Sequence, residues 1–172
     1  MTERGVPARV FAVLDAGAVR HRTIEHAPAY DADQAARLRG TPLAIGAKAL
    51  VFKLDRGIGF AVFALPADHT VDNRRLRRHL GVRRYRFATP AELAAVTTLE
   101  PGAVPPFGRP VFDLPLYVDQ ALAGSRELAF TAGSHTVSVV LATADWLAVA
   151  HPTDVFSFAT PSSPLPTGPP PR

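Results

Sequence analysis

Apolar residues recur at helical spacing in several segments of the chain. The pattern predicts helices over residues 6–16, 31–40 and 73–80, a further helix that begins at Pro90, and a short one over 145–150. Asp31 and Asp72 stand where the second and third helices begin, where a carboxylate can accept hydrogen bonds from the first backbone N–H groups. Gly17, Gly40 and Gly81 follow the ends of the first three helices, as glycine commonly does.

Other segments alternate between apolar and polar residues, or run apolar, as β-strands do. These segments cover residues 19–26, 48–54, 58–65, 110–118, 127–131 and 136–141. The turn at 55–57 joins the second and third strands as a hairpin. Strands outnumber the crossovers that an all-parallel sheet needs. We therefore expect an α/β (α+β) fold with a mixed, curved or partly barrel-like sheet and flanking helices.

Composition indicates one globular domain. The chain has 172 residues, of which 47% are hydrophobic and 20% charged, and this length can bury a full core. Six of the 17 prolines lie in the last 12 residues, which show no apolar periodicity. We expect a domain over residues 1–159 and a disordered Pro-rich tail over 160–172. A ligand for a proline-recognition domain is the alternative for this tail.

Several classes of protein are excluded by what the sequence lacks. It contains no cysteine, which excludes a disulfide scaffold, a thiol nucleophile and a cysteine-ligated metal. It has no G-x-S-x-G elbow and no H-x-x-x-H pair, so we expect no metal and no cofactor. No apolar stretch reaches the roughly 18 residues of a membrane span, and no signal-peptide pattern follows Met1. We expect a cytoplasmic protein without a membrane partner.

Positive charge is concentrated in one segment. The net charge is +4, yet residues 74–86 contain seven arginines and no acid, so the remainder of the chain carries −3. A local basic cluster of this kind is typical of a protein that binds a phosphate-bearing partner. A solvated arginine-rich face is the alternative. These arginines are Arg74, Arg75, Arg77, Arg78, Arg83, Arg84 and Arg86.

Lys48 is one of only two lysines, beside 17 arginines. In a strand it shares a face with Leu50, Phe52 and Leu54, which is the more apolar row. A partly desolvated lysine can bind phosphate as a point charge or titrate at a lowered pKa. A lysine that extends to water from the strand end is the other interpretation.

Two glycine-containing loops could line a ligand site. In the first, over 102–108, prolines fix the backbone while N–H groups remain at 102–104, 107 and 108. Such a loop can direct backbone donors at a carbonyl oxygen or a phosphate. The second, over 131–136, has glycine and small polar side chains between two strands. Plain surface turns remain the alternative for both loops.

Four stretches occur together and in order along the chain. They are IEHAPAY at 24–30, GAKALVFK at 46–53, VDNRRLRRHLG at 71–81, and FATPAEL at 87–93 leading to GAVPPFG at 102–108. In this order they resemble the YbaK/ProX family of aminoacyl-tRNA deacylases, the editing domain associated with prolyl-tRNA synthetase. The similarity runs from about Val6 to Val155, and the second stretch contains the lysine that is essential in that family.

The resemblance implies a mixed, curved sheet of about seven strands with flanking helices. It also implies a free-standing trans-editing deacylase, which hydrolyses the ester between a wrong amino acid and the 3′-terminal adenosine of tRNA. Such editing is needed because one methylene gives a synthetase only about 10–200-fold discrimination. The acceptor end of aminoacyl-tRNA is the expected partner, and an aminoacyl-tRNA synthetase could be a further one.

Roles for individual residues follow from the same resemblance. Lys48 would hold the phosphate or ribose end of the terminal adenosine, and Gly102 would begin the loop that positions the acyl carbonyl, so both are expected catalytic residues. Other expected substrate contacts are Phe52, Val104, Pro105, Phe107, Gly108, Thr131, Gly133, Ser134 and His135. The tRNA acceptor stem is expected at Arg74, Arg75, Arg77, Arg78, Arg83 and Arg84.

The chain departs from the family pattern at two points, which leaves its acyl specificity open. Ala49 stands where prolyl-type members often have asparagine, and Thr131 where some members have a pocket histidine. His135 follows four residues later, and from the pocket it could hydrogen-bond a polar acyl side chain such as Ser or Thr. Two other functions remain: a non-catalytic aminoacyl-tRNA binding module, and an aminoacyl-tRNA-dependent acyltransferase, whose acceptor site the sequence does not reveal.

Overall fold

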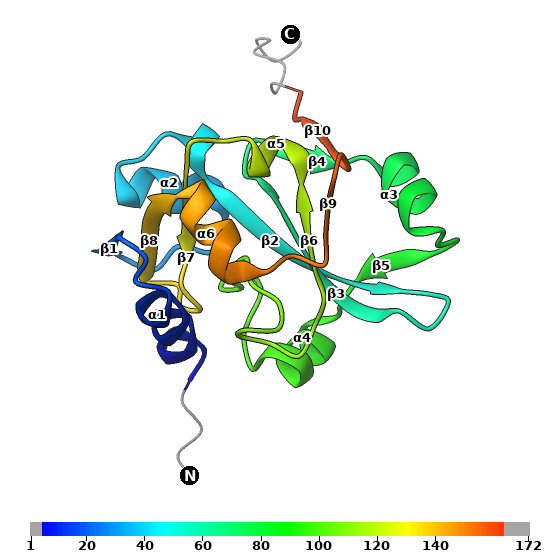
Figure 1. Cartoon of the computed structure of the whole chain (residues 1–172), viewed down its shortest axis with the longest axis horizontal. Coiled ribbons are helices and arrows are strands. Elements are labelled where there is room, and N and C mark those ends of the chain that lie inside the picture. Colours follow the sequence, from blue (N-terminus) through cyan, green and yellow to red (C-terminus); the bar gives the residue numbers. More distant parts are fainter. Residues whose placement is uncertain (1–4, 164–172) are drawn as a thin grey trace, which may run out of the picture.

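The structure, a computed structural model, describes residues 5–163. Its central sheet has five strands in the order β5-β2-β3-β6-β9 (Figure 1). β2 (Ala47–Leu54) and β3 (Gly59–Pro66) form the expected antiparallel hairpin, and β6 (Leu116–Asp119) runs parallel to β3. β5 (Tyr85–Phe87) pairs with the other edge of β2, and β9 (Asp154–Phe156) with β6. The expected mixed sheet is confirmed.

A second sheet lies beside the start of β2. It contains β1 (His21–Glu25), β8 (Val137–Ala142) and β7 (Glu127–Thr131) in the order β1-β8-β7, and all its pairs are antiparallel. A single parallel bridge between Gly46 and Ala129 connects the two sheets. The chain thus brings β7 alongside the end of β2 that carries Lys48.

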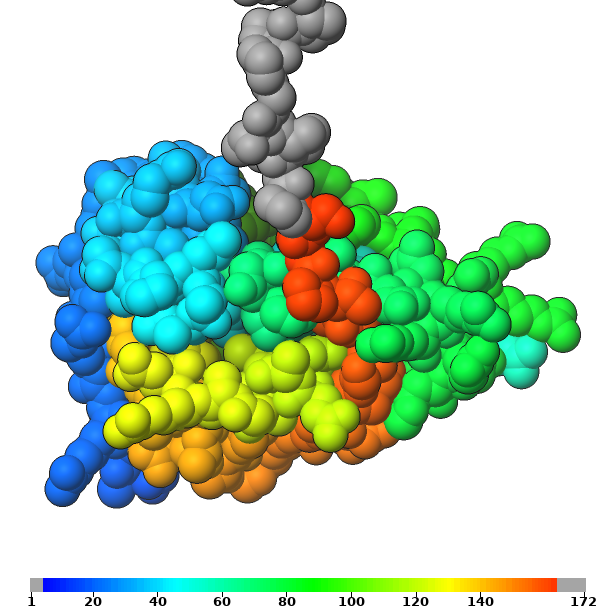
Figure 2. Space-filling view, turned by 90° about the horizontal axis from the view of Figure 1, so that it is seen from above, coloured from blue at the N-terminus to red at the C-terminus, as the bar shows by residue number. Residues whose placement is uncertain are grey.

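The C-terminal part of the described chain packs over the central sheet. β10 (Ala159–Pro161) pairs with β4 (His69–Val71), two residues beyond the boundary expected at 159. Asp119, 1% exposed, accepts hydrogen bonds from the backbone N–H groups of Phe158 and Ala159, each at 2.8 Å. Figure 2 shows this orange-to-red segment against the green part of the chain. Most of the expected Pro-rich tail, residues 164–172, lies outside the described residues.

The number of strands differs from the prediction of about seven. Residues 5–163 contain ten strands, and four of these, β4, β5, β9 and β10, are absent from the sequence prediction. Each of the four is three residues long, which is too short to show an alternating pattern.

The strand expected over residues 110–118 is wrong for most of its length. Residues 110–115 form turns, in which the carbonyl of Gly108 accepts hydrogen bonds from the N–H groups of Val111 and Phe112. Val111, Phe112 and Leu114 are nevertheless buried in the core. This burial explains why the segment has the apolar composition of a strand.

The helices agree closely with the sequence. α1 (Val6–Ala16) and α3 (Asn73–Leu80) have the expected bounds, and α2 (Ala32–Arg39) begins directly after its cap, Asp31. Pro90 opens α4 (Pro90–Thr97), as expected. The remaining helices are α6 (Thr143–Ala150), the short α5 (Gln120–Ala123) and a 3-10 turn, η1 (Leu43–Ile45). Within residues 5–163, no helix is both long and apolar enough to span a bilayer.

The two faces of β2 contact two separate hydrophobic cores. Odd-numbered residues from 47 to 51 pack into the larger core, which contains Trp146 of α6. Even-numbered residues from 50 to 54 pack into a second core, which Leu76 of α3 closes. Lys48 belongs to the even row, so its side chain leaves β2 on the side of the second core.

Candidate functional site

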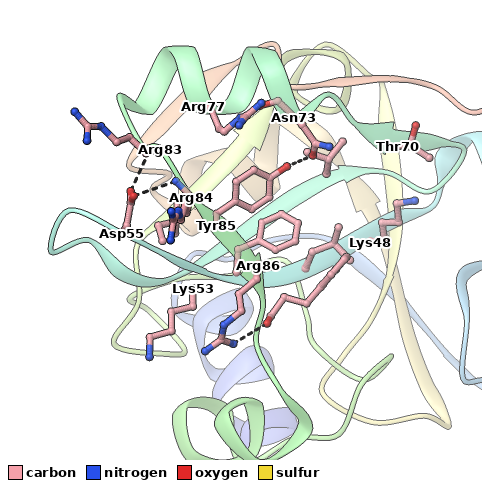
Figure 3. A pocket seen from close by; sticks show the side chains of 15 residues that line it. Lys48, Lys53, Asp55, Thr70, Asn73, Arg77, Arg83, Arg84, Tyr85 and Arg86 are labelled. Carbon is pink, nitrogen blue, oxygen red and sulfur yellow. Dashed lines mark hydrogen bonds between the residues drawn. The ribbon is translucent and has the colours of Figure 1, made fainter.

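A large open pocket lies between β2, β5 and α3, with a volume of about 1050 Å³ (Figure 3). Its floor is apolar and is formed by Leu50, Phe52 and Leu54 from β2 and by Tyr85 and Phe87 from β5. Its rim is cationic, with Lys48, Lys53, Arg77, Arg83, Arg84 and Arg86 among the lining residues. Pockets of this size accept ligands as large as a nucleotide.

Lys48 stands at one end of this pocket, near Thr70, while Arg83 and Arg84 lie at the other end (Figure 3). Burial lowers the pKa of Lys48, and the carboxylates of Asp68 and Asp33 act in the opposite direction. Among the described residues Lys48 forms no ion pair and no hydrogen bond. Its half-buried ammonium group is thus available to an anionic or polar ligand atom.

The arginines expected to bind tRNA fall into two groups. Arg77, Arg83 and Arg84 line the pocket. Arg74, Arg75 and Arg78 instead line a smaller hollow of about 620 Å³, together with Asp72, His79 and Ser157. Within the described part of the chain, Arg75 alone of these six forms an ion pair, with Asp72 at 3.4 Å. Five guanidinium groups are therefore available to an external anion.

The ion pairs at the lower rim of the pocket were not predicted. Arg86 donates to both carboxylate oxygens of Glu92 at 2.7 and 3.0 Å, and Lys53 Nζ lies 3.8 Å from the same carboxylate. Hydrogen bonding by Arg86, then by the N–H of Thr89, holds the pKa of Glu92 at about 2. The alternation of arginine and aromatic residues over 83–87 is the signal that could have identified this rim.

The 102–108 loop lies apart from the pocket and lines none of it, although the structure describes the whole loop. Val104, Pro105, Phe107 and Gly108 are all buried, and Trp146 Nε1 donates to the carbonyl of the intervening proline at 3.0 Å. Two of the five expected backbone donors are used within the loop, since the N–H groups of residues 103 and 107 donate to the carbonyls of residues 100 and 105. These four residues shape the loop from within the core.

Gly102 is the exposed residue of this loop, and the backbone of Tyr30 leaves no room for a side chain there. Its φ is +88°, and a Cβ placed there would lie 2.5 Å from the carbonyl oxygen of Tyr30. Thr131 Oγ1 donates a long hydrogen bond, 3.4 Å, to the carbonyl of Gly102. Both the backbone conformation and the contact with Tyr30 require glycine here. Because Gly102 is the one exposed residue of residues 102–108, its N–H is the loop's best-placed donor for a ligand.

His135 packs against Tyr30, whose carbonyl contacts Gly102, and the two ring centroids are 4.6 Å apart. Its Nδ1 lies 2.9 Å from the carbonyl oxygen of Ala29, which can only accept, so Nδ1 carries the proton. In the neutral form of the ring, Nε2 is then an acceptor. This buried atom has no hydrogen bond among the described residues, and Glu100 Oε2 lies 3.5 Å from it.

The contacts of Gly133 and Ser134 are structural ones, in and around the turn that contains them. A Cβ on Gly133, whose φ is +80°, would lie 2.7 Å from the side chain of Val6. Ser134 Oγ lies 3.0 Å from Thr136 Oγ1 and accepts from the N–H of the same threonine. Of the residues expected in the second loop region, the structure thus brings Thr131 to Gly102 and His135 to Tyr30.

The bridge between Gly46 and Ala129 shows where the pocket lies relative to Gly102 and its neighbours. β2 and β7 leave this bridge in the same direction, and two residues farther along they reach Lys48 and Thr131 respectively. Lys48 opens toward the pocket, whereas Thr131 contacts Gly102. The two predicted catalytic residues therefore belong to adjoining regions around the start of β2.

Residues 5–163 contain no group of three or more His, Asp or Glu side chains placed to hold a metal ion.

A Gly102→Ala variant tests the contact with Tyr30. Alanine at positive φ costs about 1 kcal/mol, and the collision with the Tyr30 carbonyl adds about 1–3 kcal/mol to the loss in the free energy of unfolding. Gly57→Ala is the matched control, because φ is +80° there but nothing lies within 4 Å of the added Cβ. Urea denaturation measures both variants. Equal losses for the two would contradict the tight contact at Gly102.

Comparison with known proteins places these features in a family. The model of the aminoacyl-tRNA editing domain matches residues 26–149. The Escherichia coli K12 protein named multifunctional Ser/Thr-tRNA deacylase ProXp-y is 38% identical over 149 residues, which cover 84% of this chain and 87% of that protein.

Solved structures share the fold. A crystal structure described as a candidate trans-editing enzyme for prolyl-tRNA synthetase is 23% identical, with a TM-score of 0.73 over 92% of this chain and 99% of that one. The crystal structure of a hypothetical protein, 19% identical, gives a TM-score of 0.75 over 88% of this chain and 99% of its own.

Proposed function

This chain belongs to the aminoacyl-tRNA editing domain family, and we propose that it is a free-standing trans-editing deacylase that hydrolyses the ester of a mischarged aminoacyl-tRNA. The pocket that contains Lys48 is the observation that carries this proposal. An RNA 3′ end offers phosphates to its cationic rim and flat bases to its apolar floor.

In this proposal Lys48 holds the terminal adenosine. Its ammonium group binds a phosphate or ribose oxygen, and its half-buried position strengthens that contact because water competes less there. Asp33 and Asp68 favour the charged form of Lys48, which is the form that binds.

Hydrolysis needs a placed water and a stabilised oxyanion. Water attacks the acyl carbon, the bond from that carbon to the ribose oxygen breaks, and the ribose oxygen takes up a proton. The N–H of Gly102 is the donor proposed for the developing oxyanion. The attacking water is aligned by backbone groups and by the neighbouring ribose hydroxyl of the substrate, so no protein nucleophile is needed.

We propose serine and threonine as the acyl groups removed. The E. coli relative is named for these two substrates, and Nε2 of His135 is an acceptor without a hydrogen bond among the described residues. A side-chain hydroxyl can donate to that nitrogen. The Glu100 side chain, 82% exposed, is free to move aside when the acyl group enters.

The arginines on both sides of α3 extend the site toward the acceptor stem. Arg77, Arg83 and Arg84 contact the end of the RNA inside the pocket. Arg74, Arg75 and Arg78 meet phosphates farther along the backbone, which positions the tRNA without reading its sequence.

Lys48→Ala tests the catalytic assignment. We expect kcat/KM for deacylation of Ser-tRNA or Thr-tRNA mischarged on a noncognate tRNA to fall about 100-fold, since a charge-assisted contact worth about 2.7 kcal/mol is lost. Wild-type activity should decline as pH rises through the lowered pKa of Lys48, and Lys48→Arg should move that decline to higher pH. The assay subtracts uncatalysed ester hydrolysis at each pH. Unchanged activity in Lys48→Ala would refute the site, and an inactive wild type that still binds tRNA would favour a binding module.

His135→Phe tests the acyl specificity. This variant keeps a ring against Tyr30 but removes the acceptor, so kcat/KM for seryl and threonyl substrates should fall about tenfold, the equivalent of one hydrogen bond. Alanyl substrates, which have no hydroxyl, should change less than about threefold. An exposed neighbour, Thr136→Ala, serves as the control. An unchanged ranking of misacylated tRNAs would contradict the role of His135.

Two triple variants of equal charge change separate the arginine groups. Replacement of Arg77, Arg83 and Arg84 by Gln should lower kcat/KM about 100-fold, and the same change at Arg74, Arg75 and Arg78 only about tenfold, since the second group contacts phosphates alone. Each triple should reduce the slope of log K for tRNA binding against log salt by about two. Unchanged slopes would remove the proposed contact with the acceptor stem, and equal losses of activity would contradict the distinction between the groups.

A further inference from the structure

Phe87 is an exposed aromatic side chain of the pocket floor to which the proposed mechanism gives no individual role. Four large apolar residues of the described chain are exposed, namely Tyr30, Leu38, Phe87 and Val155, and Phe87 is the most exposed at 62%. It is also the one of the four that lines the Lys48 pocket. A largely exposed aromatic ring on the floor of a basic pocket can bind a ligand with a flat apolar face.

The ring of Phe87 is supported from below. Phe87 lies opposite Phe52 in the β5–β2 register, and their rings meet edge to face at 4.8 Å. Tyr85 contacts Phe52 in the same way at 4.9 Å, and its hydroxyl donates to Asn73 Oδ1 on α3. The three rings form a strip along the pocket floor, which holds Phe87 in place while it remains largely open to solvent.

Fixed cations flank this ring. Arg86 precedes it in the chain, and its guanidinium group is held by both oxygens of Glu92, so its position is set before any ligand arrives. Lys53 lies 3.8 Å from the same carboxylate. Arg77, Arg83 and Arg84 line the remaining rim. An aromatic platform beside a track of cations is the arrangement by which proteins bind single-stranded nucleic acid.

The position of Phe87 relative to Lys48 indicates which nucleotide it meets. Lys48 and Phe52, the partner of Phe87, are four positions apart in β2, which corresponds to about 13 Å along the strand. Successive stacked nucleotides rise about 3.4 Å, so this span accommodates an RNA end of more than one nucleotide. With the terminal nucleotide at Lys48, there is room for an upstream base at Phe87.

We infer that Phe87 is a stacking platform for an unpaired base of the RNA 3′ end that lies upstream of the terminal adenosine. This inference rests on the proposed function, because it takes the terminal adenosine to lie at Lys48. It makes Phe87 a substrate-binding residue that selects for a single-stranded end of several nucleotides, whichever base stands there, since every base offers a π face.

Binding of a short RNA provides the first test and needs no catalysis. The probe is a fluorescent single-stranded RNA that ends in CCA, titrated against the full chain. We expect Phe87→Ala to weaken binding about tenfold, within the range that base–aromatic stacking supplies, and Phe87→Trp to restore it. Leu38→Ala removes an equally apolar exposed residue outside the pocket and should leave the affinity unchanged. Unchanged binding by Phe87→Ala, or an equal loss in Leu38→Ala, would overturn the inference.

Deacylation of two substrates provides the second test. Phe87→Ala should lower kcat/KM for aminoacyl-tRNA about tenfold but leave hydrolysis of aminoacyl-adenosine, which has no upstream nucleotide, at the wild-type rate. An equal loss on both substrates would overturn the upstream assignment. A wild type that binds the RNA through Phe87 but deacylates nothing would refute the proposed function alone, whereas an active wild type with an unaffected Phe87→Ala would refute this inference alone.

Discussion

The alternation of side chains along β2 is the constraint on which the rest of the site depends. Odd-numbered residues fill the larger core beneath α6, and even-numbered ones fill the core beneath α3. Lys48 occupies the first place of the even row, where that core opens into the pocket. A shift of one residue in the pairing with β3 would move Lys48 to the other face and exchange the two apolar rows between the cores. The position of the ammonium group is therefore specified by the burial of its neighbours.

Ion pairs divide the basic side chains of this region into two groups. One group is held by carboxylates of the protein, and the other is available to a ligand. Arg86 and Lys53 share Glu92, which ties β5, β2 and α4 together, and Arg75 is paired with the cap of α3. The other arginines of residues 74–84 form no ion pair within the described part of the chain and face two hollows on either side of α3. The net charge of +4 understates the positive charge around this pocket, because most Asp and Glu residues lie in other parts of the chain. The result is a pocket with a fixed lower rim and an upper rim that a phosphate-bearing ligand can neutralise.

The sequence predicted those features of the fold that depend on residues close together in the chain. The bounds of α1 and α3 follow from apolar spacing and from capping residues within the same segment, and the row of Lys48 follows from simple alternation. The three-residue strands escaped prediction because partners far along the chain create them, as β10 does for β4. For the same reason Tyr85 and Phe87 were not assigned to the site: their role depends on pairing with β2. Residues 110–115 misled the prediction because burial, rather than strand geometry, accounts for their apolar side chains.

The central claim is that the acceptor end of tRNA lies in the pocket between β2, β5 and α3, with its terminal adenosine at Lys48. A crystal structure of the full chain with a non-hydrolysable amide analogue of seryl-CCA tests this claim most directly. The account predicts that Lys48 Nζ lies about 3 Å from a phosphate or ribose oxygen of the terminal nucleotide and that the acyl group points toward Gly102. An RNA end bound elsewhere, with the Lys48 pocket left to solvent, would contradict it.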